Sequence, residues 1–180
     1  MTDDLPDIDS LIHQAQYREA LERLADIHGR AVGRLCMAML GDQSIAEDVA
    51  QETFLAAYKG MKNYRAEGSL RAWLFGIARR QCVRRLERGP RKHLELVEDK
   101  HESENSTDGD MLGRRRSLQL SKELSLLKPS ERDVLLMRFA GDLSFKEVAN
   151  ELNLSEASAR KRASRALLKL RERMEPGDVE

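Results

Sequence analysis

Apolar residues recur every three or four positions through most of the chain, and stretches in which apolar and polar residues alternate are almost absent. The first pattern is typical of amphipathic helices, whereas alternation would indicate strands. Residue types that favour helices fill the same stretches. The sequence therefore predicts an all-α fold. The expected helices span about Ile12–Ile27, His28–Leu40, Leu70–Arg88, Leu112–Leu127 and Glu156–Glu175.

Three more helix starts are indicated by a serine that stands three residues before a carboxylate. In a capping box the hydroxyl accepts a hydrogen bond from the backbone of the first turn, and the carboxylate reaches back to the backbone of the serine. The three pairs are Ser44 with Glu47, Ser130 with Asp133, and Ser144 with Glu147. We therefore expect helices to begin near Ile45, Glu131 and Phe145.

The equal totals of 31 basic and 31 acidic residues conceal three charged blocks. Residues 65–92 and 155–173 are strongly basic, whereas residues 95–110 hold seven acids and one lysine. This acidic block has no hydrophobic periodicity and is rich in Ser, Asn, Thr, Asp and Gly, a composition typical of solvated linkers. We therefore expect two small helical domains, residues 10–90 and 111–175, joined by a flexible linker over residues 91–110.

The composition also argues against membrane and secreted proteins. The longest uninterrupted apolar run, Leu35–Leu40, is six residues, whereas a membrane span needs roughly 20. The N-terminus is acidic and does not resemble a signal peptide. Cys36 and Cys82 are too few for a disulfide framework and lie among helix-forming residues, like small buried hydrophobic residues. We expect a cytoplasmic chain that does not insert into a membrane.

Residues 144–170 have the pattern of a helix-turn-helix unit. A short capped helix is followed by Asn153, a residue type that tolerates the left-handed backbone of a tight corner. Leu154 can fill the corner, and Ser155 can cap the next helix. A narrow stripe of mostly small residues then lets a partner helix approach one side of this second helix. The stripe consists of Ala159, Ala163, Ala166 and Leu170.

The opposite side of the second helix carries polar and basic residues that suit phosphates and base edges, among them Arg160, Lys161, Ser164 and Arg165. A solvated basic face is the alternative interpretation. The capped preceding helix and the tight corner favour a DNA recognition helix.

Residues 46–60 predict a helix with two different faces. The apolar face carries Ala46, Val49, Ala50, Thr53, Phe54 and Ala57, and the outer face carries Glu47, Asp48, Gln51, Glu52 and Leu55. A basic surface of a partner protein would suit the acidic outer face. A helix face that is merely solvated fits this segment equally well.

Five of the eight aromatic residues fall between Phe54 and Phe75, and the last three of them are interleaved with arginines. Rings stack on unpaired bases while arginines follow the phosphates, so this segment suits a single strand. For Tyr64, Trp73 and Phe75 a core position and a base-stacking position remain equally open, whereas Phe54 is expected in the core. The loop at residues 62–68 could enclose a base that has left the stack.

These segments, in this order, resemble bacterial RNA polymerase sigma factors, and the short two-domain chain resembles the extracytoplasmic-function (ECF) group of the sigma-70 family. The resemblance covers about residues 10–175. The segments that carry it are AEDVAQETFLAAY (46–58), SLRAWLFGIARR (69–80), LKPSERDVLLMRF (127–139) and the helix-turn-helix at 144–170.

The resemblance implies an alternative sigma factor that binds core RNA polymerase, directs it to promoters and helps to open the DNA. Region 2 would hold the polymerase clamp and recognise and melt the minus-10 box. Region 4 would read the minus-35 box while bound to the polymerase flap. An anti-sigma factor is implied as a further partner.

The resemblance assigns these roles to particular residues. Core-polymerase contacts would be Asp48, Gln51, Glu52 and Leu55. Contacts to minus-10 DNA would be Asn63, Tyr64, Arg65, Arg71, Trp73, Arg79 and Arg80. Contacts to minus-35 DNA would be Ser158, Arg160, Lys161, Ser164 and Arg165. Such a factor acts by binding, so we expect no catalytic residue, cofactor or metal.

Two other functions compete with this interpretation. A helix-turn-helix repressor or activator would usually dimerise on two half-sites, and it would leave the acidic helix face and the ring-arginine cluster without a role. A metal-dependent nuclease would use Asp42, Glu47, Asp48 and Glu52. On one helix Glu47 and Asp48 point about 100° apart, and the histidines with Cys82 show no zinc-ligand spacing.

Overall fold

The computed structural model describes residues 7–88 and 119–174, and every regular element within these ranges is a helix. In chain order they are α1 (Ile8–His13), α2 (Tyr17–Leu40), α3 (Gln43–Gly60), the short 3-10 helix η1 (Met61–Asn63), α4 (Leu70–Arg88), α6 (Pro129–Phe139), α7 (Phe145–Glu151) and α8 (Glu156–Met174). Residues 119–125 are also helical. The predicted all-α class is confirmed. The predicted linker, residues 91–110, lies outside the described residues.

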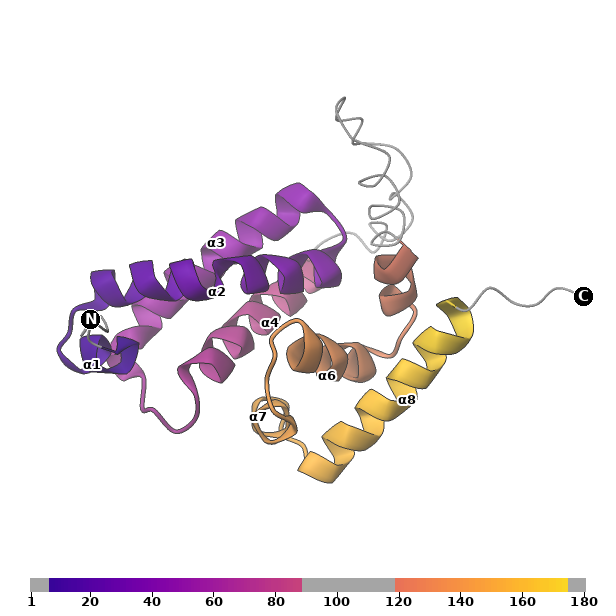
Figure 1. Ribbon diagram of the computed structural model, residues 1–180. Helices are drawn as coiled ribbons and strands as arrows, with labels where there is room; N and C mark the ends of the chain where they lie inside the picture. Colours follow the sequence, from indigo (N-terminus) through magenta and orange to yellow (C-terminus); the bar gives the residue numbers. More distant parts are fainter. Residues whose placement is uncertain (1–6, 89–118, 175–180) are drawn as a thin grey trace, which may run out of the picture.

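The N-terminal half is a bundle in which α2, α3 and α4 pack on one another (Figure 1). The predicted boundary between residues 27 and 28 is wrong, because α2 is one continuous helix through Gly29 and Gly33. A glycine within a helix costs only about 1 kcal/mol relative to alanine, and burial of Leu24, Val32 and Leu35 offsets that cost. The break lies earlier, at Ala15, whose φ is 59°.

Two of the three predicted capping boxes are wrong. Helix α3 begins at Gln43, where Asp42 accepts a hydrogen bond from the Ile45 backbone N–H at 2.9 Å, so Ser44 is not the cap. Helix α6 begins at Pro129 without a side-chain cap. Proline suits the first turn of a helix, because no intrahelical hydrogen bond is lost there.

The C-terminal half contains the predicted helix-turn-helix. Ser144 and Glu147 form the expected capping box at the start of α7. Asn153 turns the corner with a φ of 52°. The small-residue stripe of α8, namely Ala159, Ala163, Ala166 and Leu170, is buried as predicted. Helix α8 packs on both α6 and α7.

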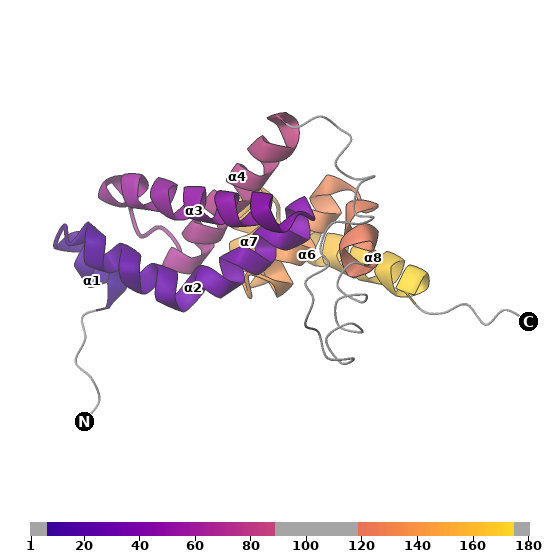
Figure 2. The same cartoon turned by 90° about the horizontal axis from the view of Figure 1, so that it is seen from above.

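The two halves pack directly on each other. Helix α4 contacts α7, and α2 contacts α6. Figures 1 and 2 show from two directions that the two halves lie side by side. At this junction a Cβ atom on Gly141 would lie 2.6 Å from the Met137 carbonyl oxygen and 2.8 Å from Cδ1 of Phe75, so the turn after α6 and its approach to α4 both need a glycine here. Among the described residues, no helix is both long enough and apolar enough to cross a membrane.

Candidate protein and nucleic-acid interfaces

The outer face of α3 is exposed along its whole length. Asp48, Gln51 and Glu52 are all exposed, and Leu55 keeps 58% of its surface accessible. The opposite face is anchored in the core, where the buried Thr53 hydroxyl donates to the Val49 carbonyl at 2.8 Å. The helix therefore presents two carboxylates, an amide and one large apolar side chain as a single surface.

The loop between η1 and α4 borders a cavity of about 350 Å³. Helix η1 supplies Asn63, the loop supplies Tyr64 and Arg65, and α4 supplies Trp73. The rings of Tyr64 and Trp73 lie 5.0 Å apart, centroid to centroid, with an interplanar angle of 53°. The cavity therefore combines two aromatic surfaces with an amide and a guanidinium group.

The Tyr64 hydroxyl is held as a neutral hydrogen-bond donor. It donates to the Gly68 carbonyl at 3.3 Å, across the base of the loop. Burial raises the pKa of Tyr64 to about 12, and the nearby carboxylates of Asp9 and Asp7 add to the shift. Helix α1 thus contributes to the loop, a contribution that local sequence patterns did not indicate.

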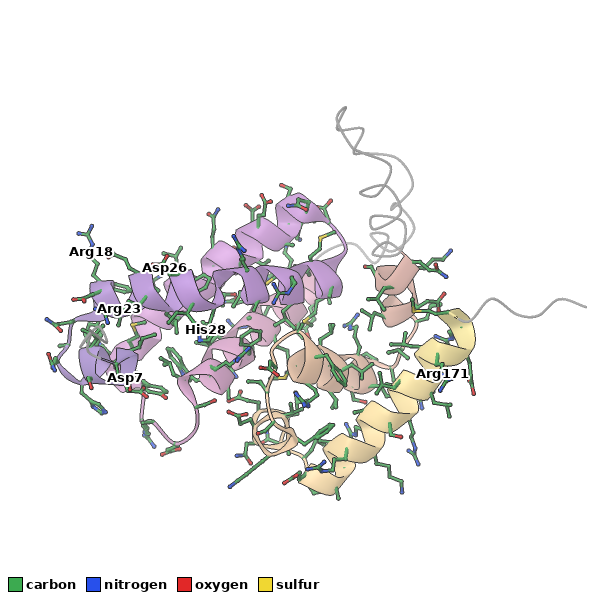
Figure 3. The ribbon with its side chains drawn as sticks, in the orientation of Figure 1. Asp7, Arg18, Arg23, Asp26, His28 and Arg171 are labelled. Carbon is green, nitrogen blue, oxygen red and sulfur yellow. The ribbon has the colours of Figure 1, made fainter. Side chains whose placement is uncertain are left out.

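Phe75 belongs to the core, which settles the question left open for this ring. It is fully buried, and its ring is nearly perpendicular to that of His28, with a centroid distance of 6.5 Å and an interplanar angle of 82°. His28 lies on the side of α2 that faces α4 (Figure 3). Burial, followed by the charge of Arg71, lowers the pKa of His28.

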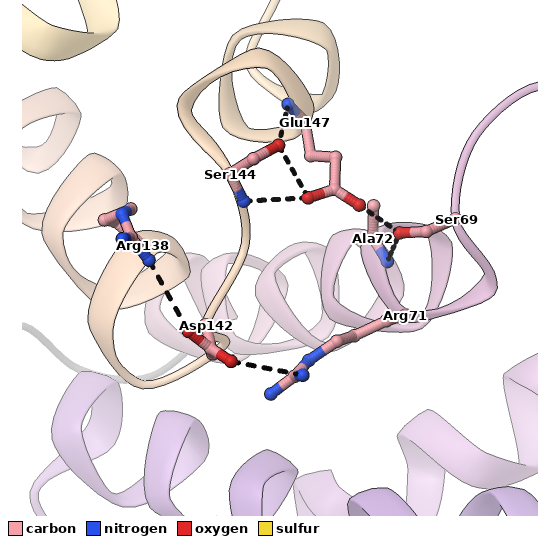
Figure 4. Close-up of polar contacts among 7 residues, drawn as sticks. All are labelled: Ser69, Arg71, Ala72, Arg138, Asp142, Ser144 and Glu147. Carbon is pink, nitrogen blue, oxygen red and sulfur yellow. Dashed lines mark hydrogen bonds and ion pairs between the residues drawn. The ribbon is translucent and has the colours of Figure 1, made fainter.

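Three predicted DNA-contacting arginines of α4 are paired with carboxylates of the C-terminal half. Arg79 places Nε 2.7 Å and Nη2 2.6 Å from Oδ2 of Asp133 on α6. Arg80 lies 3.5 Å from Glu151 on α7. Arg71 lies 3.4 Å from Asp142, in the turn before α7 (Figure 4). Arg65 instead lies 3.8 Å from Glu67 in its own loop.

Glu147 joins the N-terminal ends of two helices from different halves (Figure 4). Its Oε2 accepts hydrogen bonds from the backbone N–H and the hydroxyl of Ser144, both at 2.7 Å. Its Oε1 accepts from the hydroxyl of Ser69, which itself accepts from the Ala72 N–H at 3.1 Å. Burial acts to raise the pKa of Glu147, but the hydrogen bonds from Ser69 and Ser144 outweigh it, and the pKa lies below its usual value.

The outer side of α8 is exposed at Arg160, Lys161, Ser164 and Arg165. Arg160 is fixed in place, because Nη2 lies 2.6 Å from Oε1 of Glu156 and its guanidinium stacks 4.8 Å above the Phe145 ring. Ser158 is half-buried and belongs to the helix cap, since its N–H donates to the Ser155 hydroxyl oxygen at 3.1 Å. On the exposed face the guanidinium of Arg160 is therefore positioned by Glu156 and Phe145, and the other polar groups surround it.

Comparison with known proteins identifies both halves. The model of Sigma-70 region 2 matches residues 24–92, and the model of Sigma-70 region 4 matches residues 124–172. The chain is 31% identical over 134 residues to the RNA polymerase sigma factor YlaC of Bacillus subtilis (strain 168), covering 72% of this chain and 77% of YlaC.

A longer relative and a solved structure are also similar. The ECF RNA polymerase sigma factor SigG of Mycobacterium tuberculosis (strain ATCC 25618 / H37Rv) is 30% identical over 156 residues, and the match spans 73% of this chain but only 42% of SigG. The structure of CnrH in complex with the cytosolic domain of CnrY has a TM-score of 0.72 at 24% identity and covers 93% of this chain and 97% of that chain. That likeness shows the fold.

Region 2 followed by region 4 defines a transcription initiation factor that directs RNA polymerase to promoters. The chain belongs to the sigma-70 family of RNA polymerase sigma factors, in its ECF group. Among the described residues, no three His, Cys, Asp or Glu side chains come together as a metal site. Of the four acids considered for a nuclease, Asp42 caps α3.

Proposed function

We propose that α3 binds the clamp of core RNA polymerase through Asp48, Gln51, Glu52 and Leu55. The observation that carries this assignment is the division of α3 into a core face and a fully exposed acidic face. An exposed apolar side chain surrounded by charges is typical of an interface with a polar rim. A basic partner surface would complement the carboxylates.

We propose that the loop and α4 hold the melted non-template strand of the minus-10 box. The cavity beside Tyr64 and Trp73 is bordered by aromatic rings on which an unpaired base can stack. Asn63 and Arg65 supply donors at its edge, and Arg71, Arg79 and Arg80 supply charge for the phosphates. Flipping a base costs a few kcal/mol, which stacking and phosphate contacts together can offset.

We propose that α8 enters the major groove of the minus-35 box with Arg160, Lys161, Ser164 and Arg165, and that Ser158 contacts the backbone beside the cap. Phosphate contacts provide most of the affinity, and base contacts provide sequence preference. Because each half is small, core polymerase would raise the effective concentration of one half for DNA once the other is bound. The isolated chain would therefore bind promoter DNA weakly.

We propose further that the chain acts by binding alone, in the cytoplasm, and performs no bond chemistry of its own. We also propose that an anti-sigma factor restrains it. This partner is supported by the fold shared with CnrH, whose structure was determined in complex with the cytosolic domain of CnrY.

Run-off transcription tests the proposed function directly. Purified core RNA polymerase, this chain and a library of promoter sequences should give transcripts that depend on the chain and start at a limited set of promoters. Silence across the whole library would contradict the proposal.

The clamp contacts are tested by a pull-down with core polymerase. Replacing Asp48, Gln51 and Glu52 by alanine should lower retention of core polymerase at least about tenfold, as expected for loss of central interface contacts. A control with alanine at Glu19 and Glu22, two exposed acids of α2, removes the same charge and should leave retention unchanged. Equal retention of both variants would show that α3 is not the clamp-binding helix.

A further inference from the structure

The arginines that we assign to the melted strand are already paired with carboxylates of the same chain. Arg71, Arg79 and Arg80 project from α4, and each meets one carboxylate of the C-terminal half. Guanidinium groups bind carboxylates and phosphates with the same donor geometry. The carboxylates of the C-terminal half therefore take the place at these arginines that the phosphates of a nucleic-acid backbone would take.

The pairing removes these side chains from solvent to different degrees. The innermost pair is Arg79 with Asp133, whose side chains keep 27% and 4% of their surface exposed. On the recognition helix, by contrast, the Arg160 side chain is 61% exposed. The Arg71 and Arg80 side chains keep 35% and 50% of their surface exposed. The proposed minus-10 surface is therefore covered most closely at Arg79 and less at Arg80, while the proposed minus-35 surface is open.

Helix α7 also forms one side of the cavity next to Tyr64 and Trp73. Glu147, Asn150 and Glu151 line that side. Two of them are acids, which would repel the phosphates of an entering strand. Glu147 additionally holds the hydroxyl of Ser69, where the loop meets α4.

Helix α4 is shaped to let this neighbour approach. A Cβ atom on the buried Gly76 would overlap the carboxylate of Glu151, which reaches over the glycine to Arg80. Glycine is unfavourable within a helix by about 1 kcal/mol relative to alanine. An alanine at this position would require the Glu151 carboxylate, the end of a flexible side chain, to move away from its place beside Arg80.

We propose that the C-terminal half is an intramolecular competitor of single-stranded DNA. In the closed arrangement Asp133, Asp142, Glu147 and Glu151 occupy the strand-binding surface of α4, and the halves must separate before a strand can bind there. The exposed face of α8 remains available to duplex DNA in the same arrangement. The identity of the displaced ligand rests on the proposed function, whereas the competition itself rests on the contacts between α4, α6 and α7.

A triple variant, Asp142→Asn, Glu147→Gln and Glu151→Gln, tests the proposal in the full chain. Asparagine tolerates the left-handed backbone at position 142, where φ is 51°, and glutamine keeps the capping box at position 147. Asp133 is left intact because it is buried within α6. The control variant Glu19→Gln, Glu22→Gln and Asp26→Asn makes the same change in net charge on exposed positions of α2.

Two measurements are made on each protein. Small-angle X-ray scattering gives the radius of gyration, and fluorescence anisotropy gives the Kd for a labelled single strand of about 12 nucleotides. The triple variant should expand and bind the strand about tenfold more tightly, the order expected when three partly exposed ion pairs are weakened together. The control should change by less than about twofold. Gly76→Ala leaves the net charge unchanged. It should also raise the radius of gyration and lower the Kd for the strand, but by less than the triple variant does.

Adding Arg80→Ala to the triple variant should reverse part of the gain in strand affinity, because the gain arises on α4. The proposal would be overturned if the radius of gyration of the triple variant were unchanged, or if its gain in strand affinity were no larger than that of the control. It would also be overturned if Arg80→Ala left that gain unaltered. Transcription with core polymerase reports separately on the proposed function. If wild-type protein gave no transcripts while scattering and anisotropy gave the expected results, that outcome would contradict the promoter role and would still support the intramolecular competition.

Discussion

Lys169 of α8 places its ammonium nitrogen 2.8 and 2.9 Å from the two carboxylate oxygens of Glu131 on α6. Glu131 is only 7% exposed. The hydrogen bond from Lys169 is the main cause that lowers the pKa of Glu131. Together with the buried alanine stripe, this pair fixes the orientation of α8 on the rest of the C-terminal half.

Replacing Lys169 with methionine should therefore destabilise the chain. The substitution keeps an unbranched side chain that is only one atom shorter, but it leaves a buried carboxylate without its cation, which costs about 1–3 kcal/mol. Urea unfolding of the full chain measures the loss. Glu131→Gln in the same chain should recover part of it, because a neutral amide is cheaper to bury than an unpaired charge. Lys161→Met, at an exposed position of the same helix, should change stability by less than about 0.5 kcal/mol. Equal stability of the two lysine variants would contradict the role given to Lys169.

Local patterns predicted the parts of the fold that depend on local physics. The alanine stripe of α8, the capping box of Ser144 and the bounds of α4 follow from helical periodicity and from hydrogen bonds within one turn. The exposed acidic face of α3 follows from the same periodicity. Asp42 displaced Ser44 as the cap of α3, since both residue types make good caps and the sequence does not rank them.

Contacts between the halves could not be predicted in this way. Arg79 and Asp133 are 54 positions apart, and Ser69 and Glu147 are 78 positions apart. No periodicity connects them. Arg79 was expected to contact DNA, Asp133 and Glu147 were expected to belong to helix caps, and no local pattern gave Ser69 a partner. The continuity of α2 through Gly29 was missed for a related reason, because its stability comes from packing against α3 and α4.

Arg165 is expected to read a base. It is exposed on the outer side of α8, whereas Arg160 is already held by Glu156 and Phe145. Arg165→Ala should lower transcription roughly 5- to 150-fold on the preferred upstream sequence, which corresponds to a loss of about 1–3 kcal/mol of binding free energy, and should relax the preference at one base pair. Transcription from a library randomised in the upstream box measures this. A uniform loss on every sequence would reassign Arg165 to phosphate contact.

The two cysteines should be unreactive in the folded chain. Cys36 and Cys82 are fully buried, and their thiols are hydrogen-bonded to each other, which raises the pKa of Cys82 and lowers that of Cys36. Reaction with a thiol reagent therefore requires local or global opening. We expect rates at least about 100-fold slower than for an exposed cysteine introduced by Ser44→Cys, followed by full reaction in urea. Fast labelling of native wild-type protein would show that α2 and α4 separate readily.

His28 should make the stability of the chain sensitive to mild acid. Burial, and then the charge of Arg71, lowers the pKa of His28 from its ordinary value of about 6.5. Above that value the histidine is neutral in both the folded and the unfolded chain, so its contribution to stability is fully present. As the pH falls below about 6.5 the unfolded chain takes up the proton first, and stability is lost until the folded pKa is passed.

The urea midpoints measured at about pH 7.5 and about pH 5.5 should therefore differ more in the wild-type chain than in His28→Gln. The control His13→Gln, at an exposed position of α1, should behave like wild type. An NMR titration supplies the direct check: the pKa of His28 should rise in Arg71→Gln, and a value at or above 6.5 in wild type would contradict the packing of His28 against α4.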